Sequence, residues 1–191
     1  MAIVSAASAL TRPGPPPFSP LFERETSSGV HIWAGLQPLF LEDPPCGINQ
    51  QLNVSAWMDA SDGTTEGLGT VGVSLAHPEL VAQDSRGRLR VLSPVGYGPQ
   101  GEIEMVGVVV RAGPEVAQVR LQAAGGGVDQ MEPVDRWAFL LAPGSQLAGT
   151  VEAFATGRAP VGSLEVDEVG TLGCLVEDGP ATNAGKGALA A

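Results

Sequence analysis

The chain has 191 residues, of which 43% are hydrophobic and 16% are charged. This composition excludes a wholly disordered chain, and the length fits a single β-sandwich or barrel domain. Twenty-one acidic residues against ten basic ones give a net charge of -11, which opposes binding to the phosphate groups of nucleic acid or of an anionic membrane.

The N-terminal segment, residues 1–27, is predicted to be an extended arm. Its apolar beginning is not preceded by Lys or Arg, so we expect no signal peptide, and no stretch of the chain is long and apolar enough to predict a membrane span. Residues 12–20 contain five prolines, which favour a polyproline-like conformation. Their Pro-x-x-Pro spacing is typical either of a tether or of a ligand for an aromatic groove. The candidate assembly residues of the arm are Pro13, Pro16, Pro17, Phe18 and Pro20.

Two segments after the arm alternate with a period of two, as strands with one buried face do. Val30, Ile32, Ala34 and Leu36 alternate with His31 and Trp33, and Leu52, Val54, Ala56 and Met58 alternate with residues that include Trp57. Trp33 and Trp57 thus lie on the face opposite the aliphatic residues of their strands. Either a second layer covers that face, or the tryptophans form an exposed aromatic surface that binds a ligand.

Cys46 and Cys174 are the only cysteines. Two thiols without a Cys-x-x-Cys spacing do not make a zinc ribbon or a dithiol redox motif. Free cysteines are commonly buried, so two buried thiols are one interpretation. The other is a disulfide between Cys46 and Cys174, which would form only in an oxidising compartment.

Three short motifs match functional patterns by letter but lack the context that the function needs. Residues 67–72 and 96–101 both spell Gly-x-Gly-x-x-Gly, yet neither is followed by a predicted helix, so we interpret them as turn glycines. Residues 59–63 resemble the start of a calcium loop. Thr70 stands where an EF-hand has its last glutamate, so an Asp-Gly hairpin turn is predicted instead.

No coherent catalytic set emerges from the remaining polar residues. His31 and His77 are the only histidines, and we interpret both as surface groups. No Gly-x-Ser-x-Gly or His-Glu-x-x-His signature occurs. The acid pairs at 42–43 and 167–168 are adjacent, so their side chains would point to opposite faces of a strand, which does not suit the two carboxylates of a glycosidase. The sequence therefore predicts no catalytic residue, no cofactor and no metal ligand.

The second half of the chain carries its strongest strand signals. Residues 103–110 are apolar and rich in β-branched side chains, which predicts a central strand buried on both faces. Alternating segments follow around Val119, Trp137 and Leu164. Around Val151 the alternation predicts a strand, although residues 147, 151 and 154 also fit a helical spacing.

About ten short strands with frequent turn signals predict an all-β fold, either an antiparallel β-sandwich or a partly open barrel. The predicted β domain covers residues 28–178. Residues 179–191 offer few apolar anchors and are predicted to be a flexible tail.

Residues 106–166 resemble uncharacterised actinobacterial β-sandwich modules. The likeness rests on residues 106–111 and 116–121, a glycine turn, a Trp-x-Phe hairpin ending in Pro-Gly at 134–144, and a strand with a small turn at 151–157. It covers about a third of the chain and implies a β-sandwich fold. Those modules commonly follow a signal or lipoprotein peptide, which we do not expect here, so their extracytoplasmic location is not carried over.

Three functional hypotheses follow from these observations. The first is a non-enzymatic structural or interaction module that associates with a protein partner or with itself, for example as a component of a virion or another large assembly. The second is a ligand-binding β-sandwich that uses Trp33 and Trp57. The third is a hydrolase that uses dispersed Asp and Glu residues or His77.

Overall fold

The computed structural model describes residues 3–5, 19–38, 50–59, 62–75, 79–83, 86, 88–98, 102–166 and 171–172. Every regular element in these ranges is a β-strand, and the strands form three sheets. Among the described residues no helix has the length and apolar character needed to cross a membrane.

The first sheet is antiparallel and has the order β2-β3-β4-β5. Its strands are β2 (Ser19–Glu25), β3 (Val30–Pro38), β4 (Gln50–Asp59) and β5 (Thr65–Ser74). The two alternating segments predicted from the sequence are β3 and β4, and their aliphatic residues point to one buried face.

The second sheet lies in the middle of the molecule and has the order β11-β8-β7-β6-β14. Its strands are β6 (Glu79–Gln83), β7 (Leu89–Gly98), β8 (Met105–Ala112), β11 (Trp137–Pro143) and β14 (Thr171–Leu172). A further short strand, β1 (Ile3–Ser5), pairs with β7 in parallel, while the other pairings of this sheet are antiparallel.

The third sheet is antiparallel and has the order β10-β9-β12-β13. Its strands are β9 (Gln118–Ala123), β10 (Val128–Met131), β12 (Gly149–Phe154) and β13 (Pro160–Val166). Strand β12 decides between the two interpretations of residues 147–154, because it pairs with β9 on one side and β13 on the other.

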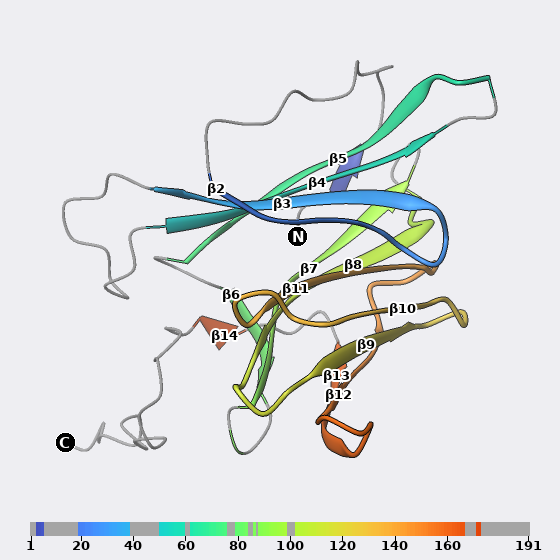
Figure 1. The fold of residues 1–191 in the computed structure, drawn as a ribbon. Helices are drawn as coiled ribbons and strands as arrows, with labels where there is room; N and C mark the ends of the chain where they lie inside the picture. Colours follow the sequence, from blue (N-terminus) through green and yellow to red (C-terminus); the bar gives the residue numbers. More distant parts are fainter. Residues whose placement is uncertain are drawn as a thin grey trace, which may run out of the picture.

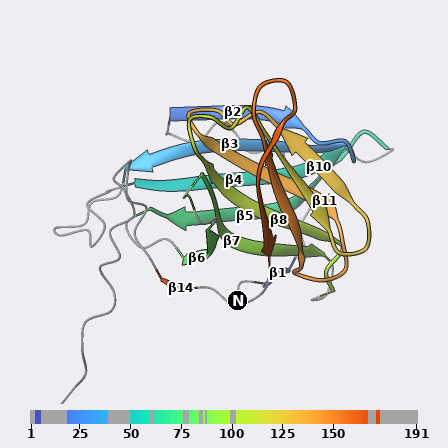
Figure 2. The ribbon, with the colours of Figure 1, turned by 90° about the horizontal axis from the view of Figure 1, so that it is seen from below.

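The three sheets stack as layers, with the β2–β5 sheet on one side of the middle sheet and the sheet of β9, β10, β12 and β13 on the other (Figure 1). Seen from below, β12 and β13 cross the direction of β3 and β4 at a steep angle (Figure 2). Alternate residues of the middle strands enter different cores. Phe139 and Leu141 face the first sheet, whereas Leu140 faces the third.

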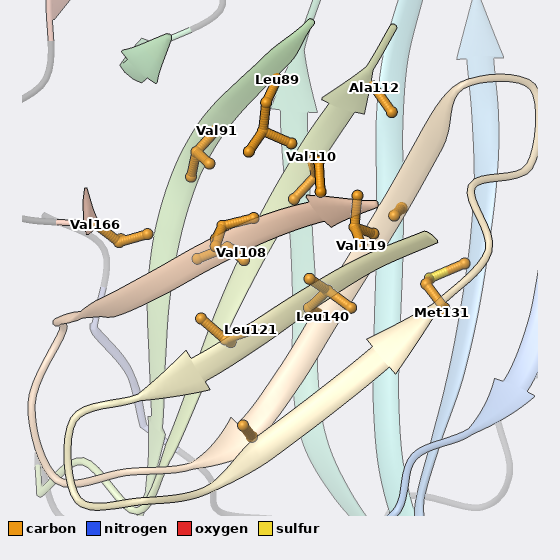
Figure 3. Packing of buried hydrophobic residues seen from close by; sticks show 14 of the residues in the cluster. Leu89, Val91, Val108, Val110, Ala112, Val119, Leu121, Met131, Leu140 and Val166 are labelled. Atoms are coloured by element: carbon orange, nitrogen blue, oxygen red, sulfur yellow. The ribbon is translucent and has the colours of Figure 1, made fainter. Parts of the chain in front are cut away.

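The first core lies between the first and middle sheets, and the second core lies between the middle and third sheets. The second core is almost entirely aliphatic. Figure 3 shows Val108 and Val110 of β8 and Leu140 of β11 pointing toward Val119 and Leu121 of β9. On the opposite side of β8, Val109 belongs to the first core. The prediction of a central strand buried on both faces is therefore confirmed by β8.

The predicted all-β fold is confirmed, and the described sheets form a layered sandwich that is not closed into a barrel. The sheets differ from the prediction at the N-terminus, because residues 19–25, predicted as part of the extended arm, form β2. Pro20 is compatible with this strand because β2 lies at a sheet edge, and the register shifts between Pro20 and Phe22. The proposed tail, residues 179–191, lies outside the described residues.

A buried ion pair connects the three layers. Arg24 of β2 points into the interior and bonds to Asp129 of β10, whose side chain is 1% exposed. The same two residues contact the backbone of β11, because Arg24 donates to the Phe139 carbonyl at 2.7 Å and Asp129 accepts from the Leu141 N–H at 2.8 Å. One residue from each outer sheet thus occupies the edge of the middle sheet.

Two further positions of the β11 edge are also protected from pairing with another strand. Trp137 exchanges two backbone hydrogen bonds of 2.8 Å with Val134, and Pro143 has no N–H to donate. An unpaired strand edge invites pairing with another chain. Side chains and a short bridge therefore occupy part of the β11 edge, where a further strand could otherwise pair.

Tyr97 of β7, the only tyrosine, is expected to remain protonated in alkaline solution for as long as the protein is folded. Burial raises the pKa of its phenol above the ordinary value of 10.0. The unfolded chain releases this proton at about pH 10, so the contribution of Tyr97 to stability is complete below that pH and falls as the pH rises further. Phenolate absorbance should therefore appear together with the loss of β-sheet circular dichroism, and Tyr97→Phe should abolish the absorbance change. Phenolate formation in a protein that is still folded would contradict this expectation.

Candidate functional site

Trp33 and Trp57, the two residues of the candidate aromatic surface, both lie on the outer face of the β2–β5 sheet. In the register of β3 and β4, Trp57 lies opposite His31, and Trp33 lies opposite Ser55. Trp57 is 6% exposed, whereas Trp33 is half-buried. The two rings are therefore diagonal neighbours on one face, and Trp57 does not form part of an open aromatic surface.

His31 accounts for part of the burial of Trp57. The two rings are stacked, with centroids 5.7 Å apart and planes inclined by 13°. His31 Nε2 also lies 3.3 Å from Asp59 Oδ2, and the His31 side chain is 30% exposed. His31 is thus fixed between an aromatic ring and a carboxylate, which goes beyond the predicted role of a plain surface group.

A histidine next to a carboxylate resembles two members of a catalytic triad, which would also need a nucleophile at the histidine. Within the described residues, no hydroxyl group is hydrogen-bonded to His31. Two hydroxyls on this face, those of Ser55 and Thr70, bond to each other at 3.0 Å. The cluster of His31, Trp57 and Asp59 therefore joins a histidine to a carboxylate, and among the described residues no nucleophile is bonded to that histidine.

A row of amide side chains crosses the same face near the other end of β3. Gln51 donates to Asn53 at 2.9 Å, and Asn53 donates to Gln37 at 3.2 Å. Gln51 lies directly over Gly72, where an added Cβ atom would approach its Nε2 to 2.1 Å. The glycine of the 67–72 motif therefore makes room for a side chain on the neighbouring strand.

The other sequence motifs have structural roles where they are described. Residues 67–72 lie within β5, and Gly96 and Gly98 lie within β7, so the prediction that these are turn glycines is wrong and they belong to strands. Asp62 accepts hydrogen bonds from the Thr64 N–H and hydroxyl, which lower the pKa of its carboxyl group. The Asp-Gly sequence connects β4 to β5, which confirms the predicted hairpin. Within the described ranges, no group of three His, Cys, Asp or Glu residues lies close enough together to hold a metal ion.

Several candidate residues fall outside the part of the chain that the structure describes. They are Pro13, Pro16, Pro17 and Phe18 of the arm, both cysteines (Cys46 and Cys174), His77, and the acid pairs at 42–43 and 167–168. Pro20 is described and is exposed in β2. The disulfide and the role of His77 stay predictions.

The pairing of β1 with β7 is a feature that sequence patterns did not reveal. Residues 3–5 align in parallel with residues 96–98 of β7, on the side where β6 no longer pairs. Gly96 lies against Ile103, and a Cβ atom at Gly98 would be 2.1 Å from the Glu102 carbonyl oxygen. The only signal in the sequence is a pair of β-branched residues, Ile3 and Val4, which is too short to predict a strand.

No family model, no curated protein and no solved structure matches this chain in comparisons with known proteins. The resemblance of residues 106–166 to actinobacterial β-sandwich modules stays a prediction.

Proposed function

We propose that this protein is a non-enzymatic interaction module that associates with further copies of itself through its N-terminal arm, as part of a larger assembly such as a virion. The observation that carries the proposal is the pairing of β1 with the edge of β7. This edge of the middle sheet accepts an extended segment through backbone hydrogen bonds, which is how strand addition joins proteins.

The connection between β1 and β2 supports exchange of this strand between molecules. Residues 6–18 include four prolines and can span about 40 Å when extended at about 3.1 Å per residue. That reach exceeds the diameter of a small domain, which is about 30 Å. A strand that pairs with β7 of its own chain can pair equally well with β7 of a neighbour, and such swapping is a low-cost route to oligomers.

The experiment compares the full chain with a variant that lacks residues 2–18. This deletion keeps β2 and Arg24, which a deletion up to residue 27 would remove. Light scattering after size exclusion should give a multiple of 19.5 kDa for the full chain, and for the deletion variant the mass of one chain, which is below 19.5 kDa because residues 2–18 are missing. Val4→Pro should also yield monomers because proline cannot donate to a ladder, whereas Ser8→Pro, which lies after β1, should stay multimeric.

Two results would contradict the proposal. A monomeric full chain would exclude self-association through the arm. A deletion variant that stays multimeric would place the contact elsewhere on the sandwich.

A ligand-binding β-sandwich is the second candidate, and the half-buried Trp33 next to the row of amides favours it. It ranks below the first because the ring of Trp57 is already stacked on His31 and almost fully buried. The amide groups of the row also bond to one another, which leaves fewer donors and acceptors for a ligand.

A further inference from the structure

The loop between β4 and β5 exposes an Asp-Gly pair. Strand pairing ends at Asp59 and Thr65, and Asp62, Gly63 and Thr64 of the intervening loop are all exposed. Gly63 has a φ angle of 81°, and in the described part of the chain nothing beyond its own neighbours lies within 4 Å of the position of an added Cβ atom. The backbone nitrogen of Gly63 thus follows the Asp62 carboxyl group directly and has no side chain beside it to hinder a reaction.

An aspartate followed by glycine has a reaction of its own, the closure of a five-membered succinimide ring. The Gly63 nitrogen attacks the side-chain carbon Cγ of Asp62, a C–N bond forms, and the nitrogen's proton leaves with the carboxyl hydroxyl group as water. Because both groups belong to one chain, this step is intramolecular and needs no partner molecule.

Water then opens the ring at one of its two carbonyl groups. Opening at Cγ breaks the new C–N bond and restores aspartate. Opening at the backbone carbonyl carbon breaks the original peptide bond and leaves isoaspartate, in which the chain continues through Cγ and the former backbone carbonyl carbon becomes a carboxylate. One water molecule is released and one is taken up, so the conversion uses no oxidant, reductant or other co-reactant.

Thr64 holds the reacting carboxylate. Asp62 Oδ1 accepts from the Thr64 N–H at 2.9 Å and from the Thr64 hydroxyl at 2.6 Å. Both bonds lower the pKa of the Asp62 carboxyl group, and the bond from the hydroxyl is the larger cause. Ring closure requires the protonated carboxyl group, because an ionised carboxylate repels the nucleophile and offers a poor leaving group. The hydroxyl of Thr64 therefore favours the unreactive form of Asp62.

We propose that Asp62 is a site of spontaneous conversion to isoaspartate and that the Thr64 hydroxyl slows this conversion. The product has one additional backbone carbon in the loop between β4 and β5. This loop begins at Asp59, whose carboxylate lies 3.3 Å from the His31 ring, so the modification changes the segment that carries one member of the His31, Trp57 and Asp59 cluster. The site shares no residue with the β1 contact and does not depend on self-association.

The test follows the full chain in water enriched in ¹⁸O at neutral pH, with digestion afterwards in ordinary water. Every opening of the succinimide places an ¹⁸O atom at residue 62, even when aspartate is restored. Mass spectrometry should show this label in the peptide that contains residue 62, and the peptide should separate into two chromatographic forms. Only one of the two should be cut by a protease that cleaves before aspartate. The second Asp-Gly pair of the chain, Asp178–Gly179, is an internal reference for the rate.

The variants separate the role of Thr64 from a general effect on the hairpin. Thr64→Val keeps the shape and the N–H but removes the hydroxyl, and it should raise the labelling rate at residue 62 by up to about tenfold, because each pKa unit changes the protonated fraction tenfold. The rate at Asp178 should not change. Thr65→Val makes the same substitution one residue later, in β5, and should react like the unmodified protein.

A second variant tests the ring itself. Asp62→Glu keeps the charge, but its longer side chain would have to close a larger ring, so labelling at residue 62 should be lost. The proposal would be overturned if the unmodified protein took up no more ¹⁸O at residue 62 than at Glu66, an exposed carboxylate without a following reactive pair in the same hairpin. Equal rates in Thr64→Val and Thr65→Val would overturn the role of the hydroxyl.

Discussion

Asp129→Asn is expected to lower the free energy of unfolding by about 3 to 5 kcal/mol, the cost typical of removing one partner of a buried ion pair. The asparagine can still accept from the Leu141 N–H, but it leaves the guanidinium of Arg24 buried without a counter-charge. Arg24 is only 14% exposed and Asp129 1%, so water cannot replace the lost partner. Urea unfolding followed by circular dichroism measures the difference.

The partly exposed ion pair of the third sheet provides the control. Arg120 donates to Glu152 at 2.8 Å, and their side chains are 39% and 31% exposed. Glu152→Gln should therefore cost no more than about 1 kcal/mol. Adding Arg24→Met to Asp129→Asn should recover part of the loss, because the unpaired charge is then removed. Equal costs for Asp129→Asn and Glu152→Gln would contradict the structural role of the buried pair.

Phe139→Ala is expected to lower the free energy of unfolding by about 3 to 5 kcal/mol, which is the usual cost of deleting a buried phenylalanine ring. Phe139 is fully buried in the core between the first and middle sheets. Its ring lies over Gly107 of β8, where an added Cβ atom would be 2.8 Å from the ring. The aromatic ring thus fills the space that the glycine leaves, and the same urea experiment measures its loss.

Phe154→Ala is the control for the same change of side chain. Phe154 is half-buried on β12 and lies beneath the guanidinium of Arg120, 5.3 Å from ring centroid to carbon. We expect its loss to cost about 1 kcal/mol, mostly through the cation–π contact. Gly107→Ala introduced together with Phe139→Ala should restore part of the stability by filling the cavity. Equal effects of Phe139→Ala and Phe154→Ala would show that the first core is not packed as described.

The fold class and many strands could be predicted because they depend on local alternation. Residues 30–36 and 52–58 show a period of two that no helix shares, and residues 103–110 are apolar at every position but a few, as a strand between two layers requires. Residues 147–154 could not be assigned from their spacing alone. They form β12 because β9 and β13 pair with them on both sides.

The candidate sites were less predictable because they depend on register and on distant contacts. The contact of His31 with Asp59 follows only once β3 and β4 are aligned. Arg24 and Asp129 are 105 residues apart. Pro20 favoured the prediction of an extended arm. The edge of a sheet also tolerates proline, so Pro20 is compatible with β2 and the arm prediction is wrong for residues 19–25.

The closure of the β11 edge by Arg24 and Asp129 has a consequence for the order of folding. The two capping residues come from different outer sheets, so the edge is protected only after both β2 and β10 have docked. Until then, the Phe139 carbonyl and the Leu141 amide are open to another chain, within a strand that is almost entirely apolar. Unpaired apolar strands of this kind promote aggregation until their long-range contacts have formed. The refolding yield should therefore depend more on chain concentration than on the final stability of the sandwich.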